Sequence, residues 1–203
     1  MLINYASWST GSDEEIVQII ELARDGTIDL QKDAKWKIGD TRTIRINAFT
    51  SGSNVSHVEQ DIDIIITSFD DYNECGCKMQ FDFKQTLAAT DSVHNWQSCT
   101  GGYRNATVFK DTLPSLVKAL PVWLNHRLIE FEVKSGDNDT GAIDTIPGNK
   151  LALRSEVEIL GKTNLSMEGE GTQLEYYKVE ENRIKTRGKN GSSPWYWWTR
   201  SPP

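Results

Sequence analysis

Three of the seven tryptophans lie within four consecutive residues near the end of the chain, at Trp195, Trp197 and Trp198, with Tyr196 between them. Indole is a large apolar group whose N–H needs a hydrogen-bond partner when it is buried. Such a cluster therefore either fills a core or lines a site where a ligand can stack. Alternation along a strand over Trp195–Thr199 would place Trp195 and Trp197 on one face and Tyr196 and Trp198 on the other. We expect one pair to lie in the core, and the other pair to be exposed unless a group outside the strand covers it.

Composition indicates a globular chain with one domain, or one domain with an extension. Of its 203 residues, 37% are hydrophobic and 25% are charged, which is typical of globular proteins. The net charge of −7 argues against a nucleic-acid partner, because phosphate backbones are bound by basic surfaces. No apolar run approaches the roughly 20 residues of a membrane helix, so we expect no membrane insertion. Residues Met1 to Thr10 lack the basic and apolar segments of a secretory signal.

Helices are predicted at three places from capping signals. They are Ser12–Arg24, Thr112–Leu120 and a single turn over Ser155–Leu160. Ser12 and Glu15 fit a capping box, Thr112 or Asp111 would cap the second helix, and Ser155 would cap the third. The segment Val122–Ile129 is interpreted as helical or extended.

Strands are predicted from alternating and β-branched segments. They are Thr41–Phe49, Asp61–Phe69, Phe81–Lys84, Ile129–Lys134, Lys150–Arg154, Leu174–Val179, Arg183–Thr186 and Trp195–Thr199. Asp61 and Asp63 are interpreted as charged residues that solvate an edge strand. Lys185 and its basic neighbours are interpreted as the solvent-exposed face of a strand. The segment Asp91–Thr107 is interpreted as an irregular loop. The mixed order predicts an α+β fold with a mixed, mostly antiparallel sheet and two or more helices. Residues 1–35 would form a helical extension and residues 36–203 a single main domain.

No catalytic motif is found around the three histidines, His57, His94 and His126. The sequence lacks a nucleophile elbow, a zinc-protease motif and a phosphate-binding glycine loop, so it predicts neither an enzyme nor a bound cofactor. Cys75, Cys77, His94 and Cys99 could be assembled into a zinc site, but Cys-x-Cys is closer than the usual spacing, and free thiols are preferred. Asp137 and Asp139 resemble the start of a calcium loop, although a solvated hairpin tip is the preferred interpretation. No metal site is therefore predicted.

Four segments carry a resemblance to a known domain family. They are Trp36–Asp40, Asn149–Glu158, Glu168–Thr172 and Trp197–Pro202. Respectively, these are similar to that family's W-x-x-G-D entry motif, its D-K-L-F-L-L-S-E-x-E segment, its E-G loop and its carboxyl-terminal W-W-L-R-S-P signature. The family is an uncharacterised domain of bacterial surface proteins and phage structural proteins.

The resemblance implies a C-type-lectin-like fold, in which irregular surface loops bind. It also implies a phage virion as the location, with the bacterial cell surface as the alternative, and other virion or surface proteins as partners. Family members continue past the signature for several strands, whereas this sequence ends at Pro203. Either those strands are dispensable, or a neighbouring subunit supplies them in an oligomer, or the chain is shortened.

The sequence therefore predicts a non-enzymatic binding or display module in a decoration, tail or receptor-binding protein that recognises a host-surface glycan or protein. The candidate ligand-binding residues are Lys189, Asn190, Ser192, Ser193, Trp195 and Tyr196, with the segment Asn95–Asn105 as a second loop. Trp197, Trp198 and Arg200 are assigned to structure, and we expect Arg200 to pair with a carboxylate. The alternatives are a purely structural virion subunit, with the tryptophans in the core and in subunit contacts, and a glycan-processing enzyme on the same fold.

Overall fold

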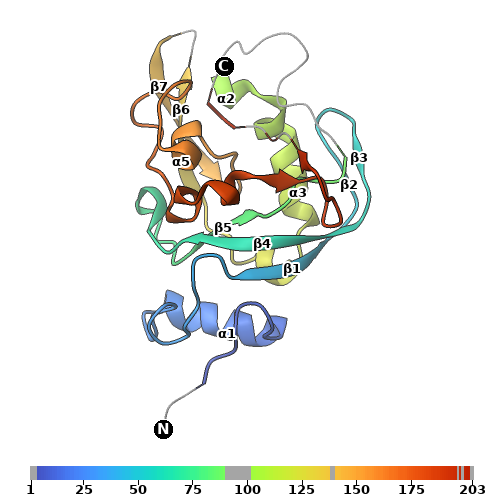
Figure 1. The fold of residues 1–203 in the computed structure, drawn as a ribbon, viewed down its shortest axis with the longest axis vertical. Coiled ribbons are helices and arrows are strands. Elements are labelled where there is room, and N and C mark those ends of the chain that lie inside the picture. The colour runs from blue at the N-terminus through green and yellow to red at the C-terminus, as the bar shows by residue number, and fades with distance from the viewer. Residues whose placement is uncertain (1–3, 90–101, 138–139, 196, 198, 202–203) are drawn as a thin grey trace.

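The computed structural model of the chain describes residues 4–89, 102–137, 140–195, 197 and 199–201. Short helices and small antiparallel sheets are combined in an α+β fold (Figure 1), which confirms the predicted class. The strands are β1 (Thr41–Ile46), β2 (Phe49–Thr50), β3 (Ser56–His57), β4 (Gln60–Ser68), β5 (Gln80–Phe83), β6 (Phe131–Asp137), β7 (Ala142–Asn149), β8 (Lys185–Thr186) and β9 (Pro194–Trp195). None of the helices in these ranges is long and apolar enough to span a membrane.

The helical elements are short except for the first. The α-helices are α1 (Asp13–Arg24), α2 (Gly102–Asn105), α3 (Leu113–Ala119), α4 (Val122–Asn125) and α5 (Glu156–Leu160). Three single turns of 3₁₀-helix are η1 (Tyr72–Glu74), η3 (Glu175–Lys178) and η4 (Glu180–Arg183), and a π-helical turn, η2 (Val108–Thr112), runs directly into α3.

The central sheet has the antiparallel order β1-β4-β5. Strand β4 is predicted correctly from its β-branched residues, and Ile62, Ile64 and Ile66 are fully buried. The interpretation of its acidic residues as edge solvation is wrong, because β4 is the middle strand. Asp61 instead lies 3.0 Å from Arg45 of β1, and the Thr43 hydroxyl donates a hydrogen bond of 2.7 Å to Asp63. These cross-strand contacts satisfy the carboxylates within the sheet.

Helix α1 has the predicted capping box. The Ser12 hydroxyl accepts from the Glu15 N–H, and the Glu15 carboxylate accepts from the Ser12 N–H. The helix lies on the β1 side of the molecule (Figure 1), and Ile16 and Ile19 join the same hydrophobic cluster as the isoleucines of β4.

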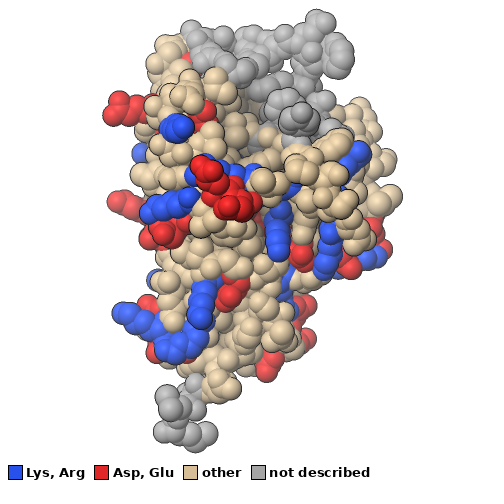
Figure 2. All heavy atoms as spheres, in the orientation of Figure 1, with Lys and Arg blue, Asp and Glu red and all other residues tan. Residues whose placement is uncertain are grey.

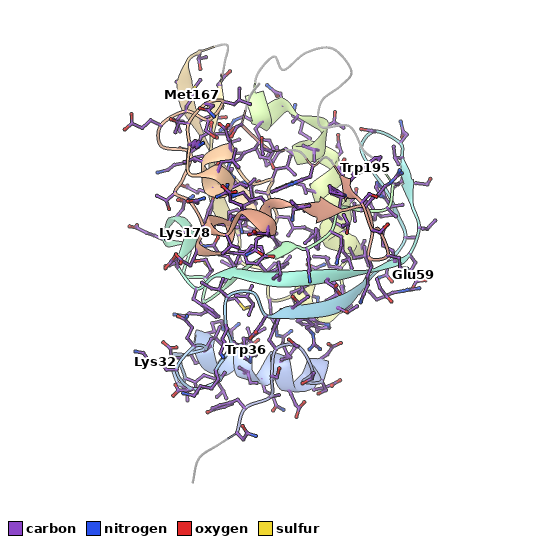
Figure 3. The ribbon with its side chains drawn as sticks, viewed as in Figure 1. Lys32, Trp36, Glu59, Met167, Lys178 and Trp195 are labelled. Atoms are coloured by element: carbon purple, nitrogen blue, oxygen red, sulfur yellow. The ribbon has the colours of Figure 1, made fainter. Side chains whose placement is uncertain are left out.

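Residues on both sides of the predicted boundary at residues 35 and 36 are in contact. Trp36 lies close to α1 (Figure 3), its ring centroid is 5.1 Å from that of Trp8, and its indole N–H donates to the Ala6 carbonyl oxygen. The division into an extension and a main domain stays a prediction.

Two predicted strands are absent from the described residues, and a third is shorter than predicted. The segment Leu174–Val179 contains the turn η3 instead, Lys150–Arg154 has no strand pairing, and the final strand ends at Trp195 rather than at Thr199. Strand β7 has no predicted counterpart; it pairs with β6 in a hairpin. These short segments take their conformation from contacts with distant residues, which periodicity does not report.

The helical predictions after residue 100 are partly right. Val122–Asn125 is helical, and α5 has the predicted Ser155 cap with a capping box to Glu158. Neither Thr112 nor Asp111 caps α3, because the preceding residues are already helical as η2. The segment Asp91–Thr107, predicted as an irregular loop, contains α2, and its residues 91–101 lie outside the described residues.

Candidate functional site

The predicted binding residues lie on one surface loop, residues 187–195, which we call the Trp195 loop. It begins after β8 and includes β9, and the two strands pair antiparallel through Lys185 with Trp195 and Thr186 with Pro194. Lys189, Asn190, Ser192, Ser193 and Trp195 are exposed, and Tyr196 lies outside the described residues. Figure 3 shows Trp195 and Glu59 on the flank opposite to Met167 and Lys178.

Trp195 presents the largest apolar group of the loop. Its side chain is 39% exposed, and the Arg187 guanidinium carbon lies 4.8 Å from the ring centroid. The Arg187 Nε donates to the Ala88 carbonyl oxygen over 2.6 Å. This cation–π contact therefore connects the indole to a fixed point of the backbone, so that Trp195 is held in place while still reaching solvent.

The start of the Trp195 loop is braced against the segment that follows β5. The Gly188 N–H donates to Thr86 O over 2.9 Å, and the Thr86 N–H donates to Thr186 O over 2.9 Å. Gly191 is required by a close approach, because a Cβ there would lie 2.3 Å from the Arg187 carbonyl oxygen. The loop is therefore a fixed turn that depends on glycine.

Lys189 anchors the loop to the central sheet. Its Nζ lies 3.0 Å from Asp63 Oδ1 and 2.5 Å from the Thr43 hydroxyl. Burial alone would raise the pKa of Asp63, but hydrogen bonds from Thr43, Gln85 and Lys189 lower it below its usual value. On the face drawn in Figure 2, basic and acidic side chains are interspersed.

Arg200 pairs with a buried carboxylate, as predicted. Its Nη1 lies 2.7 Å from Glu158 Oε2, and both side chains are only 1% exposed. The guanidinium also donates to the carbonyl oxygens of Lys134, Leu153 and Glu170. Burial would raise the pKa of Glu158, but Arg200 and Arg154 lower it below its usual value, so the carboxylate stays ionised.

Three of the segments that carry the family resemblance meet in this cluster. The Ser201 hydroxyl donates to Glu170 Oε2 over 2.9 Å and accepts from the Glu156 N–H over 2.8 Å. Glu170 Oε1 accepts from the Gly136 N–H over 2.8 Å. These groups are buried and are hydrogen-bonded to one another. The Ser-Glu-x-Glu motif at residues 155–158, the Glu-Gly motif at residues 170–171 and the Arg-Ser motif at residues 200–201 therefore stabilise the fold.

A second ionic cluster is centred on Asp82 of β5. Asp82 lies 2.8 Å from Arg154 and accepts a hydrogen bond of 2.5 Å from the Tyr177 hydroxyl. Burial raises the pKa of Asp82, but Arg154 and Lys185 lower it below its usual value. Lys185 is 8% exposed and donates to the Phe83 carbonyl oxygen, so its interpretation as part of a wet strand face is wrong. Burial lowers the pKa of Lys185 to about 8.

The predicted alternation of the aromatic cluster is wrong, although the structural role of Trp197 is confirmed. Trp197 packs with Tyr177, donates from its indole N–H to Arg183 O over 3.1 Å, and has Lys185 Nζ 4.6 Å from its ring centroid. Because β9 ends at Trp195, the two tryptophans do not share a strand face. Trp198 lies outside the described residues.

The second predicted loop is only partly described. Residues 95–101 lie outside the described ranges, and Gly102–Asn105 forms α2. Tyr103 of this helix is 3% exposed, and its hydroxyl accepts from the Leu153 N–H over 3.0 Å. Tyr103 is thus a core residue.

Cys75 and Cys77 do come together, with Asp71 as the third group. Their potential ligand atoms lie within 4.8 Å of one another, while His94 and Cys99 lie outside the described residues. The Asp71 carboxylate already accepts hydrogen bonds from the Gly76 and Cys77 N–H groups. These three groups fall short of the four ligands of a structural zinc site. Asp137, the start of the calcium-like segment, lies at the end of β6 in the β6–β7 hairpin.

A cavity of about 390 Å³ is the feature that the sequence analysis missed. It is lined by residues of α1, of the segment 72–82, of the segment 124–131 and of the segment 150–154, together with Trp8, Leu30 and Arg200. These segments are far apart in sequence and carry no shared motif, so no sequence signal points to the cavity.

Comparison with known proteins gives a match to a protein family over the carboxyl-terminal part of the chain. No curated protein and no solved structure matches the chain. The match covers the β6–β7 hairpin, α5, the Trp195 loop and Arg200, but not the sheet β1-β4-β5. Over residues 115–203, the chain matches a family described as a domain of unknown function, DUF6273.

Proposed function

We propose that this chain is a non-enzymatic binding module that recognises a glycan or a protein on a host surface through the Trp195 loop. The observation that supports this most is an exposed Trp195 held in place by Arg187 on a braced turn. Tryptophan and arginine are enriched among residues that dominate binding energy, and fixing a side chain before binding lowers the entropic cost of association.

The setting that we propose is a phage particle, with the bacterial cell surface as the alternative. It rests on the four sequence segments that resemble domains of phage structural and bacterial surface proteins. In that setting the module would be part of a decoration, tail or receptor-binding protein.

A second candidate is a structural subunit without an external ligand. Val179, Ile184 and Trp195 are 53%, 58% and 39% exposed, and all three lie in the carboxyl-terminal segment. A neighbouring subunit that covered them would bury this apolar surface. Under this alternative, replacing Trp195 would weaken self-association instead of ligand binding.

The two candidates are separated by a binding assay on an array of immobilised bacterial surface glycans, run beside sedimentation of the same proteins. For Trp195→Ala we expect a loss of array signal of about thirtyfold, as for a typical tryptophan hot spot, with sedimentation unchanged. Val122→Ala is the control, because Val122 is 70% exposed on α4. Unchanged array binding by Trp195→Ala would remove the site assignment, and altered sedimentation would favour the structural subunit.

A further inference from the structure

The cavity described above is apolar in its body. Its lining includes Leu30, Leu124, Leu128, Phe81, Phe131 and Leu151. A volume of about 390 Å³ lies within the range of roughly 300–1,000 Å³ that is typical of small-molecule pockets. Size and lining therefore suit a small molecule with an aliphatic or aromatic body.

The charge of the lining is opposite to that of the chain. The whole chain has 22 basic and 29 acidic residues. The cavity lining, in contrast, includes six basic residues, Arg24, Lys78, Arg127, Lys150, Arg154 and Arg200, and two acidic ones, Glu21 and Asp82. This reversal makes the cavity a local positive region on an acidic protein, and such a region attracts anions.

Most of these basic groups already have partners. Glu21 is shared by Arg24 at 2.7 Å and Arg127 at 3.2 Å, Arg154 pairs with Asp82 and Arg200 pairs with Glu158. Among the described residues, no ion pair involves Lys78 or Lys150. Lys78 is exposed and Lys150 is partly exposed, and both line the cavity.

We infer that the cavity binds a small amphipathic anion, with its apolar body among the leucines and phenylalanines and its acidic headgroup against Lys78 and Lys150. A lysine ammonium bonded to a carboxylate makes a charge-assisted hydrogen bond, which is stronger than a neutral one. This site is separate from the Trp195 loop and does not depend on the proposed recognition of a surface.

A matched series of ligands tests the inference by isothermal titration calorimetry on the full chain. The probes are decanoate, decanol and decylamine, which share one apolar body and differ in the headgroup. We expect decanoate to bind at least about tenfold more tightly than the other two, because only its headgroup gains charge-assisted contacts. Equal binding of decanol, or no binding of decanoate, would overturn the inference.

Two substitutions assign the headgroup contact. Lys78→Met and Lys150→Met keep the apolar stem and remove the charge, and we expect each to weaken decanoate binding about tenfold without changing decanol binding. Lys162→Met is the control, because Lys162 is exposed and does not line the cavity. Full decanoate affinity in the Lys78→Met, Lys150→Met double variant would contradict the assignment.

Discussion

At the scale of single residues, Lys185 shows how a charged side chain can be enclosed by partners that lie far away in the sequence. Its ammonium group donates to the Phe83 carbonyl oxygen and faces the ring of Trp197. Burial opposes its charge, Asp82 favours it and Arg154 opposes it again, and the pKa of Lys185 falls to about 8. The folded protein thus binds this proton less tightly than the unfolded chain does.

Lys185 should make stability rise with pH in the alkaline range. Between the folded pKa of about 8 and the ordinary pKa of 10.5, the unfolded chain holds more protons than the folded protein, so the free energy of unfolding increases with pH. Lys185→Met lacks this titration. Measured by urea unfolding, the free energy of unfolding of the wild type should increase between about pH 8 and about pH 10 by about 2 kcal/mol more than that of Lys185→Met. An equal change in both proteins would show that Lys185 titrates normally in the fold.

Cys77 should react slowly with alkylating reagents. Burial raises the pKa of its thiol to about 12, and the thiolate is the reactive form. Alkylation by iodoacetamide at neutral pH, followed by tandem mass spectrometry, should be on the order of a thousandfold slower at Cys77 than at a free cysteine in a peptide. Alkylation at the rate of the free peptide would show that the thiol is accessible and ionises normally.

At the scale of elements, Arg200 connects parts of the fold that are distant along the chain. Its guanidinium contacts β6 through Lys134 O, α5 through Glu158, and the carbonyl oxygens of Leu153 and Glu170. A buried ion pair contributes little net stability compared with apolar residues, but removing one partner leaves an uncompensated buried charge.

Removing either partner of the Arg200–Glu158 pair should be strongly destabilising. Arg200→Met and Glu158→Gln should each lower the free energy of unfolding by about 3–5 kcal/mol, as measured by urea unfolding. The double variant leaves no unpaired charge, so its loss should be smaller than the sum of the two single losses by about 1–3 kcal/mol. Simple additivity would show that the two side chains contribute independently.

The turn of the Trp195 loop can be disturbed without removing Trp195. In Gly191→Ala the new Cβ would meet the Arg187 backbone, so the turn that carries Arg187 must shift. We expect a loss of glycan-array binding similar to that of Trp195→Ala, with a change in the free energy of unfolding within about 2 kcal/mol.

Gly141→Ala is the control for the Gly191 substitution. Gly141 also lies in a surface turn, with a φ of +66° and no other atom within 4 Å of the point that a Cβ would occupy, but it belongs to the β6–β7 hairpin. Binding by Gly141→Ala should be unchanged. Normal binding by Gly191→Ala would show that the shape of the turn is unimportant for recognition.

At the scale of the whole molecule, signals from neighbouring residues in the sequence are sufficient to predict some elements and insufficient to predict others. The capping box at Ser12, the cap at Ser155 and the β-branched run of β4 depend on neighbouring residues, and the structure has all three. The class α+β and the pairing of Arg200 with a carboxylate were also predictable. The prediction for Lys185 was wrong because its enclosure by Phe83, Asp82 and Trp197 is created only by tertiary packing.

The same distinction applies to the sites. The Trp195 loop could be placed at the surface from its glycines, serines and aromatic residues. The cavity could not be found, because its lining comes from segments that are far apart in the sequence and its positive charge contrasts with an acidic composition. The buried cluster around Glu158, Glu170 and Arg200 explains why three resembling motifs occur together, since each supplies a partner to the others.

Recognition of a host surface is tested most directly by flow cytometry of the fluorescently labelled protein on a panel of bacterial strains. The wild type should label a subset of strains, and Trp195→Ala should lose about nine-tenths or more of that signal while unfolding at the same temperature. Ile184→Ala, which removes a more exposed apolar side chain outside the loop, should label the same strains as the wild type. Equal labelling by Trp195→Ala and the wild type, or no labelling of any strain, would contradict the account.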